Sequence, residues 1–163
     1  MINFFIGGKP TESPLKEGDK IPAFVLNNQD GKSVNMADFI GKTAMVIYFY
    51  PKDDTPGCTK ESCSFRDSFQ DFKDVGAEVF GISGDDEKSH KKFAEKHRLP
   101  FTLLADKDNH VREKIFGVPR GVLGLLPGRV TYIVNKEGVI IKVFNSMSGA
   151  NHHTEALEIL KKK

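Results

Sequence analysis

Apolar residues along this chain recur with two periods, one typical of strands and one typical of helices. A continuous apolar run at 44–50 predicts a central strand that is buried on both faces. Beyond Thr55-Pro56, apolar side chains at helical spacing predict a helix that continues until Gly76. The other expected elements are a hairpin at 24–34, strands at 78–83 and 101–105, helices at 87–97 and 110–116, a hairpin at 129–144 and a final helix at 154–162.

The order of these elements indicates the fold class. Strands and helices alternate, which argues for α/β layers around a sheet, and the hairpin near the end of the chain makes that sheet mixed. The thioredoxin architecture has this outline, although the pattern alone does not distinguish it from other small α/β folds. We therefore expect a mixed central sheet flanked by helices, with an N-terminal β-hairpin. Residues 1–16 are expected to form a tail and residues 17–163 a single domain.

Composition narrows the classes of partner. The 24 basic and 22 acidic residues of this 163-residue chain are interspersed and leave a formal net charge of +2, so neither nucleic acid nor a membrane surface is expected as a partner. No apolar stretch approaches the roughly 20 residues that a membrane span needs. The first residues lack the features of a secretory signal or a transit peptide. The expected location is therefore cytoplasmic, or organellar if a transit peptide has been removed.

The two cysteines carry the candidate chemistry. If Thr55 is the N-cap of the expected helix, Cys58 lies in its first turn, where unpaired backbone N–H groups and the helix dipole favour a thiolate. The thiolate is the nucleophilic form of cysteine. A lone cysteine is often only a small buried apolar residue, but this placement directly after a central strand favours a reactive thiol.

Cys63 limits which chemistry is available. In an intact helix, residues five apart have Cα atoms roughly 8.7 Å apart, beyond the ~7 Å limit for a disulfide. A disulfide between Cys58 and Cys63 therefore requires local unwinding of the helix. The C-x-x-C motif of thioredoxin-type oxidoreductases is absent. A zinc site would need about four ligands, and the distant pair His152 and His153 makes only a thin case for one.

At these residues the sequence resembles the peroxiredoxins. Their Pro-x-x-x-Thr-x-x-Cys pattern is matched by Pro51, Thr55 and Cys58. The C-x4-C spacing, with Phe-Tyr-Pro before it and Phe-Arg-Asp after Cys63, is similar to the peroxiredoxin Q or bacterioferritin-comigratory-protein branch. The resemblance extends from about residue 17 to the C-terminus and includes the segments at 81–85, 99–106 and 126–132.

The resemblance implies a role for each matching residue. Cys58 would be the peroxidatic cysteine, and Cys63 the resolving cysteine that joins it in an intramolecular disulfide. Thr55 would hydrogen-bond the thiolate and the peroxide, Pro51 would shield the pocket from water, and Arg129 would supply a fixed cation. The implied substrate is a hydroperoxide, and the implied reductant is thioredoxin or a similar thiol protein. No cofactor or metal is implied, and the protein is expected to be a monomer, with a weak dimer as the alternative.

Two other functions stay open at this point. One is a thiol–disulfide oxidoreductase, against which the missing C-x-x-C speaks, and the other is a redox sensor that uses the same cysteines.

The apolar loop at 117–128 either flanks the pocket and favours organic hydroperoxides or packs on its own domain. His90 and His97 are expected to be solvated, and His152 and His153 are given no catalytic role.

Overall fold

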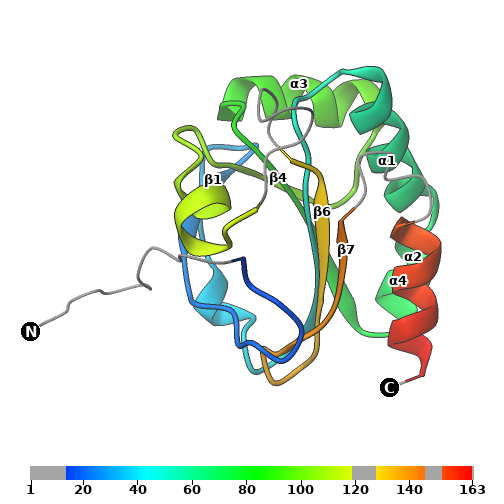
Figure 1. Ribbon diagram of the computed structural model, residues 1–163. Coiled ribbons are helices and arrows are strands. Elements are labelled where there is room, and N and C mark those ends of the chain that lie inside the picture. Colours follow the sequence, from blue (N-terminus) through cyan, green and yellow to red (C-terminus); the bar gives the residue numbers. More distant parts are fainter. Residues whose placement is uncertain (1–13, 119–127, 146–151, 163) are drawn as a thin grey trace, which may run out of the picture.

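The computed structural model describes residues 14–118, 128–145 and 152–162, and it is built around one sheet with helices on both faces (Figure 1). In chain order the elements are β1 (Val25–Asn28), β2 (Ser33–Asn35), η1 (Met36–Asp38), β3 (Ala44–Phe49), α1 (Pro56–Asp67), α2 (Phe69–Asp74), β4 (Ala77–Ser83), α3 (Glu87–His97), β5 (Thr102–Ala105), η2 (Val111–Ile115), β6 (Val130–Val134), β7 (Ile140–Asn145) and α4 (His152–Lys161).

The sheet is mixed, as the element order predicts. Its seven strands follow the order β2-β1-β5-β4-β3-β6-β7. The three central strands are parallel, with β4 between β3 and β5. Strand β6 pairs with β3, and β7 pairs with β6; both of these pairings are antiparallel. The hairpin β1–β2 extends the sheet beyond β5, with β1 antiparallel to β5. The α/β class, the mixed sheet and the N-terminal hairpin are therefore confirmed.

Strand β3 divides the core into two parts. All six of its residues are buried, and successive side chains point to opposite faces of the sheet. Val46 and Tyr48 join a cluster beneath helices α1, α2, α3 and α4, while Ile47 and Phe49 join a cluster beneath η1 and η2. A strand that is apolar at every position can only lie between two covered faces, which is why the run at 44–50 marks the centre of the fold.

Two expected helices differ from the observed ones. The helix expected between Thr55 and Gly76 is interrupted at Ser68, whose ψ of 8° leaves the helical range, so that two helices form. The helix expected at 110–116 is a single π-helical turn at Val111–Ile115. Its start is held by the Asp106 carboxylate, which accepts hydrogen bonds from the backbone N–H groups of Val111 and Arg112. The expected helix is therefore present as one short turn, and Asp106 satisfies two of the backbone N–H groups at its start.

Most of the expected N-terminal tail, residues 1–13, lies outside the described residues. Leu15 packs against the core, and its backbone N–H donates to the carbonyl of Phe116. The boundary between residues 16 and 17 stays a prediction.

Gly81 in β4 makes room for the side chain that connects the sheet to α1. A Cβ at this position would lie 2.7 Å from both Cζ and the hydroxyl oxygen of Tyr48 and 2.9 Å from Cδ2 of Leu103. Tyr48 fills this space, and its hydroxyl lies 2.8 Å from Oγ of Ser62 on α1. Burial raises the pKa of Tyr48 well above its ordinary value, so the hydroxyl stays neutral. The missing side chain of Gly81 thus helps to seat the helix that carries both cysteines.

We expect Gly81→Ala to lower the free energy of unfolding by about 1–3 kcal/mol, because the added methyl group overpacks Tyr48. Urea unfolding followed by circular dichroism measures the change. The exposed residue Glu78 on the same strand supplies a control, and Glu78→Ala should change the free energy by less than about 0.5 kcal/mol. A Gly81→Ala protein as stable as the parent would contradict this account of Gly81.

Candidate active site

Cys58 lies where the loop after β3 becomes α1. It is the third residue of that helix, as expected, and only 1% of its surface is exposed. The Nη2 atom of Arg129 donates a hydrogen bond to Sγ of Cys58 at 3.2 Å. Gly57 allows this approach, since a Cβ there would lie 3.2 Å from Nη2. The structure therefore brings together a cysteine and an arginine that are 71 residues apart in the sequence.

Strand register explains why these two residues meet. Phe49 at the end of β3 is paired with Val130 at the start of the antiparallel strand β6. The residue before Val130 is Arg129, so its side chain emerges beside the loop that leads from β3 to α1. An antiparallel neighbour thus begins at the edge of the sheet where β3 ends.

A carboxylate lies on the other side of the guanidinium. Nη1 of Arg129 donates to Oε1 of Glu61 at 2.5 Å, and both side chains are almost fully buried. Burial by itself would lower the pKa of Arg129, but Glu61 and Cys58 outweigh it and raise that pKa above its ordinary value. The guanidinium is therefore a permanent positive charge beside Sγ.

Sequence reasoning missed Glu61 and the histidine beyond it. Oε2 of Glu61 lies 3.2 Å from Nδ1 of His152, the first residue of α4. Nδ1 also lies 2.6 Å from Oγ1 of Thr131. Glu61 follows Cys58 by three positions, which places both on one face of a helix, so this spacing could have indicated it. No comparable local pattern connects His152 to the cysteines.

The other three predicted site residues surround Cys58 along the chain. Thr55 occupies the N-cap position, but its hydroxyl makes no capping bond and instead donates to the carbonyl of Lys52 at 2.9 Å. Pro51 is half-buried in the loop. Cys63 is partly exposed on α1, and both cysteines are free thiols. Because α1 is continuous from Pro56 to Asp67, both cysteines lie in one intact helix. The geometry of that helix keeps their Cα atoms beyond disulfide distance, as expected from their spacing.

Known proteins resemble this chain over most of its length. The model of the AhpC/TSA family matches residues 17–143. The chain belongs to this family. Peroxiredoxin Q of Populus jackii, named as chloroplastic, is 50% identical over 147 residues, which are 90% of this chain and 68% of that protein. Peroxiredoxin Q of Suaeda salsa, also named as chloroplastic, is 52% identical over 86% of this chain and 65% of its own length. The chain thus spans about two thirds of these relatives.

Solved peroxiredoxin structures have the same fold. Peroxidoxin BcpB of Mycobacterium tuberculosis superposes with a TM-score of 0.83 and 36% identity over 91% of this chain and 97% of that one. A Xanthomonas campestris bacterioferritin comigratory protein, studied for alkyl peroxide reduction, has a TM-score of 0.77 and 30% identity over 85% and 90% of the two chains. These likenesses confirm the expected thioredoxin-like peroxiredoxin fold and support a thiol peroxidase role.

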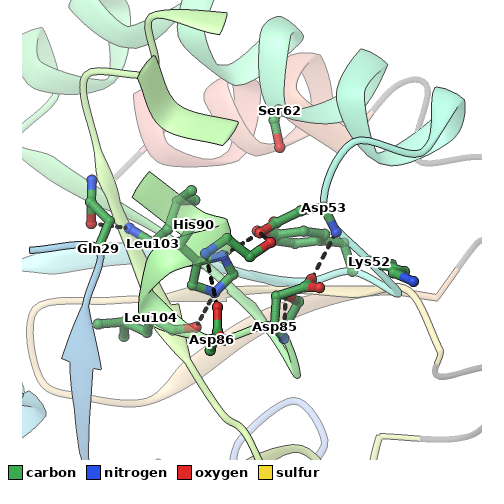
Figure 2. A network of polar contacts seen from close by, with 12 residues as sticks. Gln29, Lys52, Asp53, Ser62, Asp85, Asp86, His90, Leu103 and Leu104 are labelled. Atoms are coloured by element: carbon green, nitrogen blue, oxygen red, sulfur yellow. Dashed lines mark hydrogen bonds and ion pairs between the residues drawn. The ribbon is translucent and has the colours of Figure 1, made fainter. Parts of the chain in front are cut away.

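In this peroxiredoxin the loop before α1 is anchored to α3 by a buried pair that sequence reasoning misjudged (Figure 2). His90 was expected to be solvated, yet it is fully buried, with Nδ1 2.8 Å from Oδ2 of Asp53. Its Nε2 lies 3.0 Å from the carbonyl of Leu104. Since a carbonyl only accepts, Nε2 is the donor in this contact. The charged composition of α3 concealed this inward-facing histidine.

The expectation for His97 is also only partly right. Its side chain is 19% exposed, and Nε2 lies 3.3 Å from Oδ1 of Asp54 in the same loop. Asp53 and Asp54 thus both face α3, one in the interior and one at the surface.

Asp53, Asp85 and His90 place ligand atoms within 4.8 Å of one another, close enough in principle to hold a metal ion. Their atoms already have other partners. Asp53 accepts from the hydroxyls of Tyr50 and Ser89, and Asp85 accepts from the backbone N–H of Asp53. Hydrogen bonding inside the cluster accounts for the arrangement, so we interpret it as an anchor of the loop.

Arg112 is a second buried arginine at this end of the sheet. Its guanidinium donates to the carbonyl of Tyr50 at 2.5 Å and to that of Gly128 at 2.6 Å. These carbonyls directly precede Pro51 and Arg129, so Arg112 holds together the two segments that supply the site. Desolvation lowers the pKa of Arg112. The ordinary pKa of an arginine is so high that the side chain nevertheless stays charged. Nothing in the local pattern distinguished it from a solvated arginine.

Among the described residues, no helix combines the length and the apolar character that crossing a bilayer requires.

We expect Arg112→Met to lower the free energy of unfolding by about 2–4 kcal/mol, because two buried carbonyls lose their donor. Chemical denaturation measures the loss. Lys114→Met, at an exposed position of the same turn, is the control and should leave stability nearly unchanged. Equal stabilities of the two variants would show that Arg112 does not hold the segments together.

Proposed function

We propose that this peroxiredoxin reduces hydrogen peroxide and organic hydroperoxides to water and alcohols, with Cys58 as the peroxidatic cysteine. The observation that carries the proposal is the hydrogen bond from Arg129 to Sγ of Cys58 at the start of α1. A buried cation next to a thiol at a helix N-terminus favours the thiolate, which is the nucleophile.

In the first step the sulfur attacks the terminal oxygen of the peroxide. An S–O bond forms as the O–O bond breaks, and the leaving oxygen takes up a proton as water or an alcohol. Cys58 is oxidised to a sulfenic acid while the peroxide is reduced. Negative charge develops on both oxygens, so the fixed donors of Arg129 stabilise the transition state. The Thr55 hydroxyl completes the site by turning from Lys52 to the thiolate and the peroxide, and Pro51 limits access of water.

In the second step Cys63 resolves the sulfenic acid. Its sulfur attacks Sγ of Cys58, an S–S bond forms, and the sulfenic oxygen leaves as water with the proton of the Cys63 thiol. The first turns of α1 unwind for this step, because an intact helix holds the two Cα atoms too far apart. Thioredoxin or a similar dithiol then supplies two electrons and two protons by thiol–disulfide exchange.

The range of substrates and the setting belong to the same proposal. The alkyl peroxide reduction attributed to the Xanthomonas campestris protein supports organic hydroperoxides as substrates. The apolar loop at 117–128 was expected either to flank the pocket or to pack on its own domain, and its residues 119–127 lie outside the described residues. We propose a monomer that acts in peroxide detoxification and redox homeostasis. The cytoplasmic location stays a prediction, and the chloroplastic names of the relatives support its organellar alternative.

A coupled assay with thioredoxin, thioredoxin reductase and NADPH tests the roles of the cysteines. With hydrogen peroxide and then cumene hydroperoxide, Cys58→Ser should abolish NADPH oxidation. Cys63→Ser should still consume about one equivalent of peroxide but should block turnover by thioredoxin. Peroxide turnover by Cys58→Ser would overturn the assignment. Reduction of insulin without peroxide turnover would instead indicate a thiol–disulfide oxidoreductase, and oxidation without turnover a redox sensor.

Arg129→Met should slow the reaction of the reduced protein with hydrogen peroxide by about 100-fold, because a charged donor aimed at the developing oxyanions is lost. Stopped-flow kinetics under pseudo-first-order conditions measure the rate. Arg66→Met, which removes a partly exposed arginine of α1, is the matched control and should retain the parent rate. An unchanged rate in Arg129→Met would contradict the role given to this residue.

A further inference from the structure

Glu61 lies between the two cysteines in the sequence, and this position has a consequence for the proposed resolution step. The side chain is buried on the same helix, three residues after Cys58 and two before Cys63. Unwinding that brings Cys58 and Cys63 within disulfide distance therefore includes the backbone of Glu61. Such unwinding would displace this carboxylate from its buried position.

Two groups on other elements would lose their contact with Glu61 when this side chain is displaced. Arg129 pairs with Oε1, and Nδ1 of His152 lies 3.2 Å from Oε2. Oε2 makes no hydrogen bond to any residue that the structure describes, so its attraction to His152 depends on charge. Neither partner belongs to α1: Arg129 precedes β6, and His152 begins α4.

His152 itself is held by the sheet. Its Nδ1 lies 2.6 Å from Oγ1 of Thr131 on β6, and its ring lies 5.5 Å from that of Phe144 on β7. The side chain is only 3% exposed. Helices α1 and α4 lie on the same face of the sheet (Figure 1). His152 is therefore attached to β6 and β7 as well as facing Glu61 of α1.

We propose that His152 is a positioning residue that acts on Cys58 through Glu61 and Arg129, and that its protonation holds α1 in the wound state. The inference rests on the proposed function, since resolution by Cys63 is what requires the unwinding. With α1 wound, an imidazolium at His152 has the Glu61 carboxylate as its counter-charge. With α1 unwound, the same imidazolium would lack that counter-charge, so its protonated form would be less stabilised.

The sign of the pH dependence follows from this difference. Protonation of His152 is more favourable in the wound state than in the unwound state, so the wound state binds more protons. Its stability is therefore greatest at low pH and falls as the pH rises through the range in which imidazoles titrate, roughly pH 5–8. Resolution should be favoured at the upper end of this range.

The charged groups around His152 come from each element packed against it. Glu61 faces it from α1, and Arg129 lies beyond Glu61 at the start of β6. On β7, Lys142 lies over the Phe144 ring, 5.9 Å from its centroid. Within α4 the neighbour is His153, whose pKa is lowered chiefly by burial. His153 makes no ion pair with Glu61 among the described residues, but its ring lies 6.3 Å from that of Phe65 on α1 and the charge of Glu61 acts to raise its pKa. The His153→Gln variant therefore measures how much of a pH effect comes from this neighbouring histidine.

Amide hydrogen exchange of the reduced protein tests the inference. Protection of residues 60–64, corrected for intrinsic exchange rates, is compared at pH 6 and pH 8 in the parent, His152→Gln and His153→Gln. Gln retains hydrogen-bonding capacity but does not titrate. We expect protection to be about fivefold or more higher at pH 6 in the parent and in His153→Gln, and this difference to vanish in His152→Gln. No difference in the parent, or one that persists in His152→Gln, would overturn the proposal.

A thiol can itself titrate in this range, so the three proteins are also compared in a Cys58→Ser background, where the same pattern is expected. Loss of the pattern there would assign the pH effect to the thiol and overturn the role of His152.

A single-turnover experiment connects this behaviour to resolution. After one equivalent of hydrogen peroxide, acid quenching and alkylation measure the rate of disulfide formation. The ratio of the His152→Gln rate to the parent rate should be larger at pH 6 than at pH 8, and a ratio independent of pH would count against the proposal. If the parent consumes no peroxide, the proposed function fails, whereas the exchange data still decide whether His152 holds α1.

Discussion

A buried positive charge at the end of the central sheet is the constraint around which the site is arranged. Isolated charges are expensive to bury, and Arg129 is retained in the interior by an ion pair with Glu61 and a hydrogen bond to Cys58. The helix α1 supplies both partners, so the arginine and the helix stabilise each other. The electrostatic arrangement that suits a reactive thiolate is at the same time a condition for packing α1 against the sheet.

The precision of this arrangement depends on contacts outside the immediate site. Arg112 joins the carbonyls of Tyr50 and Gly128, and thereby the end of β3 to the segment before β6. On the other side of the loop, His90 on α3 holds Asp53 in the interior. Between these two attachments the chain turns from strand to helix and presents Cys58. Polar side chains that are individually costly to bury thus fix a short loop in one conformation.

The two steps of the proposed cycle require different conformations of α1. The wound helix positions Cys58 beside Arg129, but it keeps Cys63 out of reach. The same unwinding that would permit a disulfide would also separate Glu61 from Arg129 and His152. A stable wound state favours the reaction with peroxide, and an accessible unwound state favours resolution, so the proposed activity needs a moderate free-energy difference between them.

The sequence by itself determined the strand and helix order, the placement of Cys58 in the first turn of a helix and the need to unwind that helix, because these depend on local periodicity and helix geometry. The family pattern added Thr55, Pro51 and Arg129. Only the tertiary structure decided that Glu61 lies between Arg129 and His152. It also decided that Arg112 joins two strand ends and that His90 is buried. These contacts join residues far apart in the chain, and a charged residue that is buried and paired has the same local pattern as one in water.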